Sequence, residues 1–160
     1  METESLNKLL TELINQENEL QFSSFSNDDA FQLGTMILNE AKSNNKSVTI
    51  DISLNNHCLF HYAMTGTSID NAEWIRRKKN VVNRFRHSSF FMGTKMKNEE
   101  KDFYETYSLP EIDYAAHGGA FPLIIKDVGV VGSIAVSGLP QQEDHELVVK
   151  VINMYLEKTG

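Results

Sequence analysis

Histidine and cysteine are the residue types here that could hold a metal ion, and two of the five histidines have a suggestive spacing. His57 and His61 are four residues apart, the spacing at which two side chains share one face of a helix. They lie in a predicted strand, however, where about 3.3 Å per residue separates them by roughly 13 Å. No other spacing of His, Cys, Asp or Glu is typical of a zinc site. We therefore expect no metal centre.

A serine hydrolase is the next chemistry that the residues suggest. The run His117, Gly118, Gly119 is similar to the oxyanion-hole segment of lipases and esterases, whose nucleophile lies in a Gly-x-Ser-x-Gly turn. Ser133 and Ser137 both lack the flanking glycines that such a turn needs. We therefore interpret the paired glycines as a turn that enters a strand.

Two further patterns also fail. Gly129 and Gly132 do not form the G-x-G-x-x-G pattern of a dinucleotide-binding loop, and the sequence contains no Walker A motif. Asp144 and His145 are adjacent in a predicted helix, where consecutive side chains point about 100° apart. We therefore expect neither a nucleotide loop nor an acid–base dyad at these positions.

Residues 76–86 hold the strongest charge feature, with six of the 15 lysines and arginines and no acidic residue. The segment carries +6 in a chain of net charge −7, so the remaining residues carry −13. Such a run usually forms a solvated helix face or salt bridges with a neighbouring subunit. The alternative is an anion site that uses Arg76, Lys79 or Arg84, because guanidinium groups suit bidentate contacts with carboxylate or phosphate. With Trp74 beside it, such a site would suit a flat apolar anion such as haem.

Two β-hairpins and several amphipathic helices must position these candidates. Residues 48–54 alternate apolar and polar side chains, and the pair Asn55–Asn56 after them tolerates the positive φ of a tight turn. Hairpins imply an antiparallel sheet, and helices before, between and after them could cover both its faces. The expected helices are 4–19, a segment capped by Ser26, 69–88, 95–107 and 140–157, and the expected strands are 48–54, 57–64, 121–126 and 129–137.

The composition is typical of one soluble, cytoplasmic domain. A chain of 160 residues, 41% apolar and 23% charged, can bury about two-thirds of its unfolded surface. It has no 18-residue apolar run for a membrane span, and its acidic start is unlike a signal peptide. Cys58 is the single cysteine, which excludes an internal disulfide. The net charge of −7 argues against nucleic acid as a partner.

Three segments together resemble a small family without an assigned reaction that is grouped with the GlcG and HbpS proteins under the haem-degrading domain. They are WIRRKKNVVNRFRHSS (74–89), YAAHGGAFP (114–122) and GSIAVSGLPQQEDH (132–145). The resemblance implies an α+β fold, namely a profilin-like three-layer α/β/α sandwich with a central five-stranded antiparallel sheet, in one domain over residues 1–160. Residues 21–24 or 114–118 are the candidates for the fifth strand. The resemblance also implies a homo-oligomer and, for the broader group, haem as a possible cofactor.

Three functions are compatible with these features. The first is a non-enzymatic, homo-oligomeric module that binds a small ligand, such as an anion, or a partner protein. The second is a haem-binding or haem-degrading protein, with His117 or His87 as the axial ligand. The third is an enzyme that acts on a small organic anion held by Arg76 or Arg84. The candidate ligand-binding residues are Trp74, Arg76, Lys79, Arg84, His87, His117, Gly118, Gly119 and Phe121.

Overall fold

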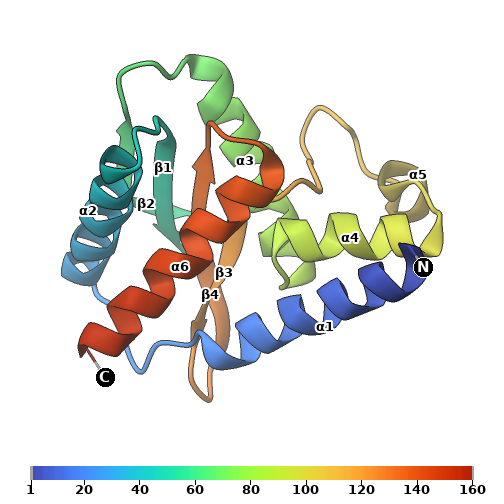
Figure 1. Ribbon diagram of the computed structural model, residues 1–160, viewed down its shortest axis with the longest axis horizontal. Helices are drawn as coiled ribbons and strands as arrows, with labels where there is room; N and C mark the ends of the chain where they lie inside the picture. Colours follow the sequence, from blue (N-terminus) through green and yellow to red (C-terminus); the bar gives the residue numbers. More distant parts are fainter. Residues whose placement is uncertain (1, 160) are drawn as a thin grey trace.

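Two hairpins form one antiparallel sheet in the computed structural model, which describes residues 2–159 (Figure 1). The first hairpin consists of β1 (Thr49–Leu54) and β2 (His57–Ala63), and the second of β3 (Ala120–Ile125) and β4 (Gly129–Ser137). Because β1 pairs with β4, the strand order is β2-β1-β4-β3. The expected antiparallel sheet is therefore confirmed, with β2 and β3 at its edges.

The sheet has four strands where we expected five. Phe22 makes a single parallel bridge to the end of β3, with backbone hydrogen bonds of 2.8 and 2.9 Å on its two sides. The chain then turns away because Ser26 starts the next helix with a capping box. The Ser26 hydroxyl accepts from Asp29 N at 3.1 Å, and Ser26 N donates to the Asp29 carboxylate at 2.7 Å. The other candidate segment, residues 114–118, contains no strand.

Six helices surround the sheet within residues 2–159. Helices α2 and α6 pack on one face, α3 packs on the other, and α1 lies beside α4 at one end of the molecule (Figure 1). None of these helices combines the length and the apolar character that crossing a membrane requires. Their bounds are α1 (Glu2–Glu19), α2 (Asn27–Ser43), α3 (Ile69–Phe85), α4 (Ser89–Glu99), α5 (Phe103–Tyr107) and α6 (Gln141–Thr159).

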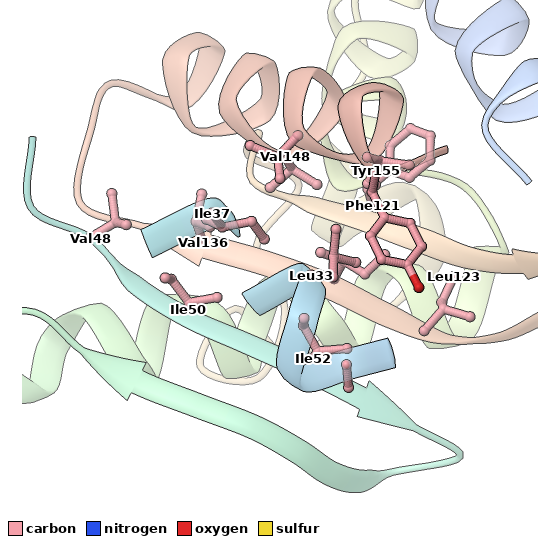
Figure 2. Packing of buried hydrophobic residues seen from close by; sticks show 14 of the residues in the cluster. Leu33, Ile37, Val48, Ile50, Ile52, Phe121, Leu123, Val136, Val148 and Tyr155 are labelled. Atoms are coloured by element: carbon pink, nitrogen blue, oxygen red, sulfur yellow. The ribbon is translucent and has the colours of Figure 1, made fainter. Parts of the chain in front are cut away.

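The main core lies between the sheet and the pair α2 and α6. Successive strand residues point to opposite faces, so Ile50 and Ile52 of β1 face these helices together with Val136 of β4 (Figure 2). Leu33 of α2 and Val148 of α6 fill the space above them. The opposite face is more polar, because it carries Thr49, Asp51, Ser53 and Ser133 beside a small apolar cluster under α3.

The helix expected at 95–107 was wrong, because the chain forms two shorter helices there. Ser88 accepts from Phe91 N at 3.0 Å and starts α4 much earlier than the sequence pattern indicated. Glu100 then adopts a left-handed conformation, with φ of 55°, and ends α4. Asp102 caps the five-residue helix α5. Likewise α3 ends at Phe85 rather than at residue 88.

Candidate functional site

A pocket opens where the start of α3, the glycine-rich loop before β3 and the β4–α6 connection meet. Its volume is about 310 Å³, at the lower end of what small-molecule sites occupy. Trp74, His117 and Gly118, all candidates from the sequence, line it. The other polar residues around it are Asn71, Lys78, Ser137, Gln141 and Asp144.

A buried ion pair between Lys78 and Asp144 forms one wall, and each side chain is only 3% exposed. Lys78 Nζ lies 3.4 Å from Asp144 Oδ2 and donates to Gly118 O at 3.0 Å and Val136 O at 2.8 Å. An ammonium group has three hydrogens, so each has an acceptor. Asp144 Oδ1 accepts from Leu139 N at 3.0 Å. The pair therefore ties α3 to the glycine-rich loop, to β4 and to α6.

Burial disfavours the charged form of both partners. It raises the pKa of Asp144 to about 6, although Lys78 and two backbone N–H groups lower it. Burial also lowers the pKa of Lys78, against the raising effect of Asp144. A buried ion pair loses the free energy of hydration of both charges, and this loss is compensated only by good geometry and further hydrogen bonds. The surrounding carbonyl and amide groups are therefore as important to this pair as its mutual attraction.

His117 and Trp74 form the aromatic part of the lining. Their rings meet edge to face, with centroids 5.5 Å apart and an interplanar angle of 86°. Arg77 Cζ lies 4.6 Å from the Trp74 ring centroid, a cation–π distance. Burial lowers the pKa of His117, and the charges of Lys78 and Arg77 lower it further. The imidazole is therefore neutral at neutral pH and keeps one ring nitrogen with a free lone pair.

The paired glycines are needed for close packing around Lys78. A Cβ at Gly118 would overlap the Gln141 carbonyl oxygen, while Gly118 N donates to Gln141 Oε1 at 2.9 Å. Gly119 has φ of +138°, and a Cβ there would overlap Lys78 Nζ and lie 2.6 Å from Val136 O. Only glycine tolerates both the left-handed backbone and the approach of the ammonium group. The expected turn into a strand is thus confirmed, with a reason that the sequence did not reveal.

The remaining candidates lie outside the pocket. Arg76 pairs with Glu73 at 3.2 Å and with Asp113 at 3.0 Å. His87 Nδ1 lies 2.7 Å from the buried Glu17 carboxylate, where α1 meets α4. Phe121 is 1% exposed and belongs to the main core. Lys79 pairs with Asp51 on β1, and Arg84 lies 5.9 Å from the Phe85 ring centroid. The structure therefore separates the nine candidates into several distinct places.

The basic segment of α3 is largely used inside the chain. Besides the ion pairs of Arg76, Lys78 and Lys79, Arg77 donates to the carbonyls of Glu111 and Tyr114, and Arg86 donates to a carbonyl of β4. Three of the six residues form ion pairs, and all three find their partners in the same chain rather than in a neighbouring subunit. Arg84 alone among the six has neither an ion pair nor a hydrogen bond to a side chain or carbonyl within residues 2–159.

Lys78 and Asp144 were missed as site residues. A signal for Lys78 does exist: it follows Ile75 by three residues and precedes Val82 by four, so it lies on the apolar stripe of α3. A lysine on that stripe must be buried and therefore needs a partner. Nothing local identifies the partner, since Asp144 is 66 residues away.

The pocket fits a small polar ligand better than haem. A neutral imidazole at His117 is the kind of ligand that haem iron accepts, and Trp74 offers an aromatic surface. However, Leu139 is the only other large apolar residue in the lining, whereas a macrocycle needs apolar contact on both faces. Ser137 Oγ, the one hydroxyl of the lining, accepts from Asn71 Nδ2 at 3.3 Å and lacks a hydrogen-bonded histidine among the described residues. Within residues 2–159, therefore, this hydroxyl is not part of a Ser–His arrangement.

Known proteins similar to this chain fall into one family. Residues 25–153 match the family model described as "Haem degrading protein HbpS-like". The UPF0303 protein of Edwardsiella ictaluri is 48% identical over 152 residues, which cover 95% of this chain and 97% of that protein. The UPF0303 protein of Psychromonas ingrahamii is 44% identical over 143 residues, covering 89% and 90%.

Two solved structures also resemble this chain. The crystal structure of Ybr137w protein superposes with a TM-score of 0.85 at 40% identity, covering 94% of this chain and 90% of that one. The structure of a PduOC:heme complex has a TM-score of 0.70 at 16% identity and covers 81% of this chain and 94% of the other. At that identity the second likeness shows a common fold and nothing more.

Proposed function

The chain belongs to the HbpS-like family of haem-degrading proteins, as the resemblance predicted, and on this premise we propose that it is a non-enzymatic, homo-oligomeric binding module. The pocket beside Trp74 and His117 would hold a small ligand. The observation that carries this proposal is the Lys78–Asp144 pair, whose ammonium hydrogens all have acceptors within the protein. This ion pair therefore maintains the shape of the pocket, and the Lys78 ammonium group has no free hydrogen to donate to a substrate.

The ligand that suits this lining is small, planar and largely uncharged. Trp74 is 39% exposed and offers an aromatic surface, while the neutral His117 can both donate and accept a hydrogen bond. Asn71 and Gln141 add amide groups to the lining. An organic anion fits less well, because Arg76 already contacts two carboxylates and Lys79 contacts a third. This is why an enzyme acting on such an anion is not our proposal.

Haem binding is the second candidate, favoured by the lowered pKa of His117 and by the family. His117 would be the axial ligand, and Trp74 would contact the macrocycle. When bound, haem would supply the redox and ligand-exchange chemistry of its iron. The second apolar face of the macrocycle would have to come from another subunit. His87, the other candidate ligand, already contacts the buried Glu17 carboxylate.

Self-association is supported by two strongly exposed apolar side chains. Ile69, at the start of α3, is 82% exposed, and Ile112, in the loop after α5, is 75% exposed. We propose that both contribute to a contact between subunits, since exposed apolar surface marks protein interaction sites. We further propose that residues 1–160 form one domain with profilin-like layering and that the protein acts in the cytoplasm. Light scattering on the purified protein tests the oligomer, and a monomer at all concentrations would contradict it.

Trp74 provides a direct test of the pocket, since it is the single tryptophan of the chain. Ligands that enter the pocket should change its fluorescence in a saturable way, and His117→Ala should abolish that change. His87→Ala is the matched control because this histidine lies away from the pocket. Screening a panel of small planar metabolites, with product analysis after incubation, tests both binding and the absence of turnover. Saturable quenching that His117→Ala leaves intact would contradict the proposed site.

A haemin titration separates the two candidates. A saturable, shifted Soret band at one haem per subunit that His117→Ala removes and His87→Ala retains would establish haem as the ligand. A weak, non-saturating change that is the same in the unmodified chain and in both variants would favour the other small ligand.

A further inference from the structure

A second cluster of reactive side chains lies on the β1–β2 hairpin, on the sheet face that α3 covers. Ile52 pairs with Phe60, but the next residue, Ser53, pairs with Cys58, so Leu59 is an extra residue in β2. Such a bulge places consecutive residues on the same face. Leu59 and Phe60 accordingly both pack against the main core.

The bulge brings Cys58 and His61 to the same side of the sheet. In a regular strand, residues three apart point to opposite faces. Here His61 is paired with Asp51 and Cys58 with Ser53, and directly paired residues share a face. Asp51 and Ser53 are two apart in β1 and also share a face. The side chains of Asp51, Cys58 and His61 therefore converge.

The distances within this cluster are those of metal ligands. Cys58 Sγ lies 3.7 Å from Asp51 Oδ2, and His61 Nδ1 lies 3.2 Å from the same oxygen. One donor atom from each of the three residues lies within 4.8 Å of the others. Zinc bonds of about 2.3 Å to sulfur and about 2.0 Å to nitrogen and oxygen, at tetrahedral angles, separate S and O by about 3.5 Å and N and O by about 3.3 Å. The Sγ–Oδ2 and Nδ1–Oδ2 distances are therefore within about 0.2 Å of those in such a site.

The carboxylate is already oriented for this role. Asp51 Oδ1 lies 2.9 Å from Lys79 Nζ and accepts from Ser53 Oγ at 2.8 Å, while Lys79 also donates to Ser53 Oγ at 2.8 Å. Oδ2 therefore remains directed toward Cys58 and His61. Groups that fix a ligating carboxylate in this way are typical of metal sites.

The charges also balance. A divalent ion with a thiolate, a carboxylate and a neutral imidazole has no net charge, and Lys79 adds +1. This leaves room for water or a small anion as a further ligand, and the thiol proton is released to solvent on binding. Access is open, because β2 is an edge strand, Cys58 is exposed and the His61 side chain is 41% exposed.

We propose that Asp51, Cys58 and His61 form a three-ligand site for a divalent ion of the zinc type, with a fourth position open to solvent. Thiolate and imidazole donors select zinc or cobalt over magnesium or calcium. Three protein ligands plus an open position is the arrangement of exchangeable or reactive zinc sites rather than of closed structural ones. The site is separate from the Trp74–His117 pocket and opposes our expectation from the sequence that the chain has no metal centre.

Cobalt(II) is the probe, added to the full, metal-stripped and reduced chain. We expect a thiolate-to-cobalt charge-transfer band and visible bands of four-coordinate cobalt, saturating at one ion per chain. One equivalent of zinc should remove these bands, because zinc binds such donors more tightly than cobalt. Cys58→Ser should abolish the charge-transfer band, and His61→Ala should weaken binding by more than about tenfold.

His57→Ala is the matched control, since His57 lies on the same strand but outside the cluster. It should bind cobalt as the unmodified chain does. Circular dichroism confirms that each variant is folded, and Asp51 is left unchanged because it is buried against Lys79. The proposal is overturned by a missing charge-transfer band at saturating cobalt, by equal binding in His61→Ala, or by an equal loss in His57→Ala.

Discussion

Lys78 and Lys79 are neighbours on α3, yet their ion pairs differ in burial and in what they leave free. The Lys78–Asp144 pair connects α3 to α6, and both side chains are 3% exposed. The Lys79–Asp51 pair connects α3 to β1, with side chains 18% and 8% exposed. In the first pair each ammonium hydrogen has an acceptor, whereas in the second Asp51 Oδ2 faces a thiol and an imidazole.

The pKa values of the two aspartates move in opposite directions. Burial raises that of Asp144 to about 6, and Lys78 only partly opposes it. Burial also raises the pKa of Asp51, but the charge and hydrogen bond of Lys79, with Ser53 and His61, outweigh it and lower the pKa overall. The Lys78–Asp144 pair therefore stabilises the packing of α3, whereas the Lys79–Asp51 pair leaves a carboxylate that can bind a further cation.

Removing Lys78 should have the largest effect. Lys78→Met leaves Asp144 buried without its partner, and losses of this kind cost about 3–5 kcal/mol of unfolding free energy. Urea denaturation measures this cost. The double variant Lys78→Met/Asp144→Leu should recover most of it, because well-packed apolar residues can replace a buried pair. A cost below about 1 kcal/mol for Lys78→Met would mean that the pair does not stabilise the packing of α3.

Gly119→Ala should come next, at about 3 kcal/mol, since it combines a strained backbone with overlap at Lys78 Nζ. Gly129→Ala is the matched control: its φ of +119° is also unfavourable, but a Cβ there meets no atom within 4 Å. The difference between the two variants in urea denaturation isolates the overlap with Lys78. Equal costs would show that the ammonium moves aside freely.

A pH dependence should follow, with opposite signs for two adjacent residues. Burial lowers the pKa of His145 to about 4, so its unfolded form binds more protons above that pH and stability rises up to about pH 6.5. Asp144 has its pKa raised to about 6, so its folded form binds more protons and stability falls as pH rises from about 4 to 6.

These two effects nearly cancel in the unmodified chain and should be separated by substitution. As the pH rises from 4 to 6, the unfolding free energy of Asp144→Asn should increase by about 2 kcal/mol, because only the effect of His145 remains. Over the same range the unfolding free energy of His145→Gln should decrease by about 2 kcal/mol, because only the effect of Asp144 remains. Urea midpoints at the two pH values measure both. Slopes of the same sign in the two variants would refute this assignment.

Lys79→Met should have the smallest effect, about 1 kcal/mol, because its pair is less deeply buried. Urea denaturation beside Lys78→Met gives the comparison directly. A cost for Lys79→Met equal to that for Lys78→Met would remove the distinction between the two pairs.

The sequence predicted the elements better than the contacts between them. Periodicity located α1, α2, β1 and β4 closely, because local packing dictates those patterns. The capping serine before α4 was overlooked, which made one helix out of two. The bulge in β2 left a signal in hindsight: Leu59 and Phe60 are adjacent apolar residues between polar neighbours, which breaks strict alternation. Along a regular strand His57 and His61 are too far apart to share an ion, and Cys58 and His61, three residues apart, point to opposite faces. The spacing therefore predicted no site shared with Asp51.

The site was predictable only in part for the same reason. Residue type alone predicted Trp74 and His117. The conformational freedom of glycine predicted Gly118 and Gly119. Lys78, hidden in a basic run, meets Asp144 through tertiary packing, which spacing along the chain does not encode.

The Lys78 ammonium also constrains the order in which the chain can fold. Its acceptors lie 40, 58 and 66 residues further along, on the glycine-rich loop, on β4 and on α6. During synthesis, the segment from α1 to α4 is complete before any of these acceptors is made. A compact state of that early segment would have to bury an unpaired ammonium group. Stable docking of α3 onto the sheet is therefore expected only after α6 has emerged, so the last helix to be made completes the first half of the fold.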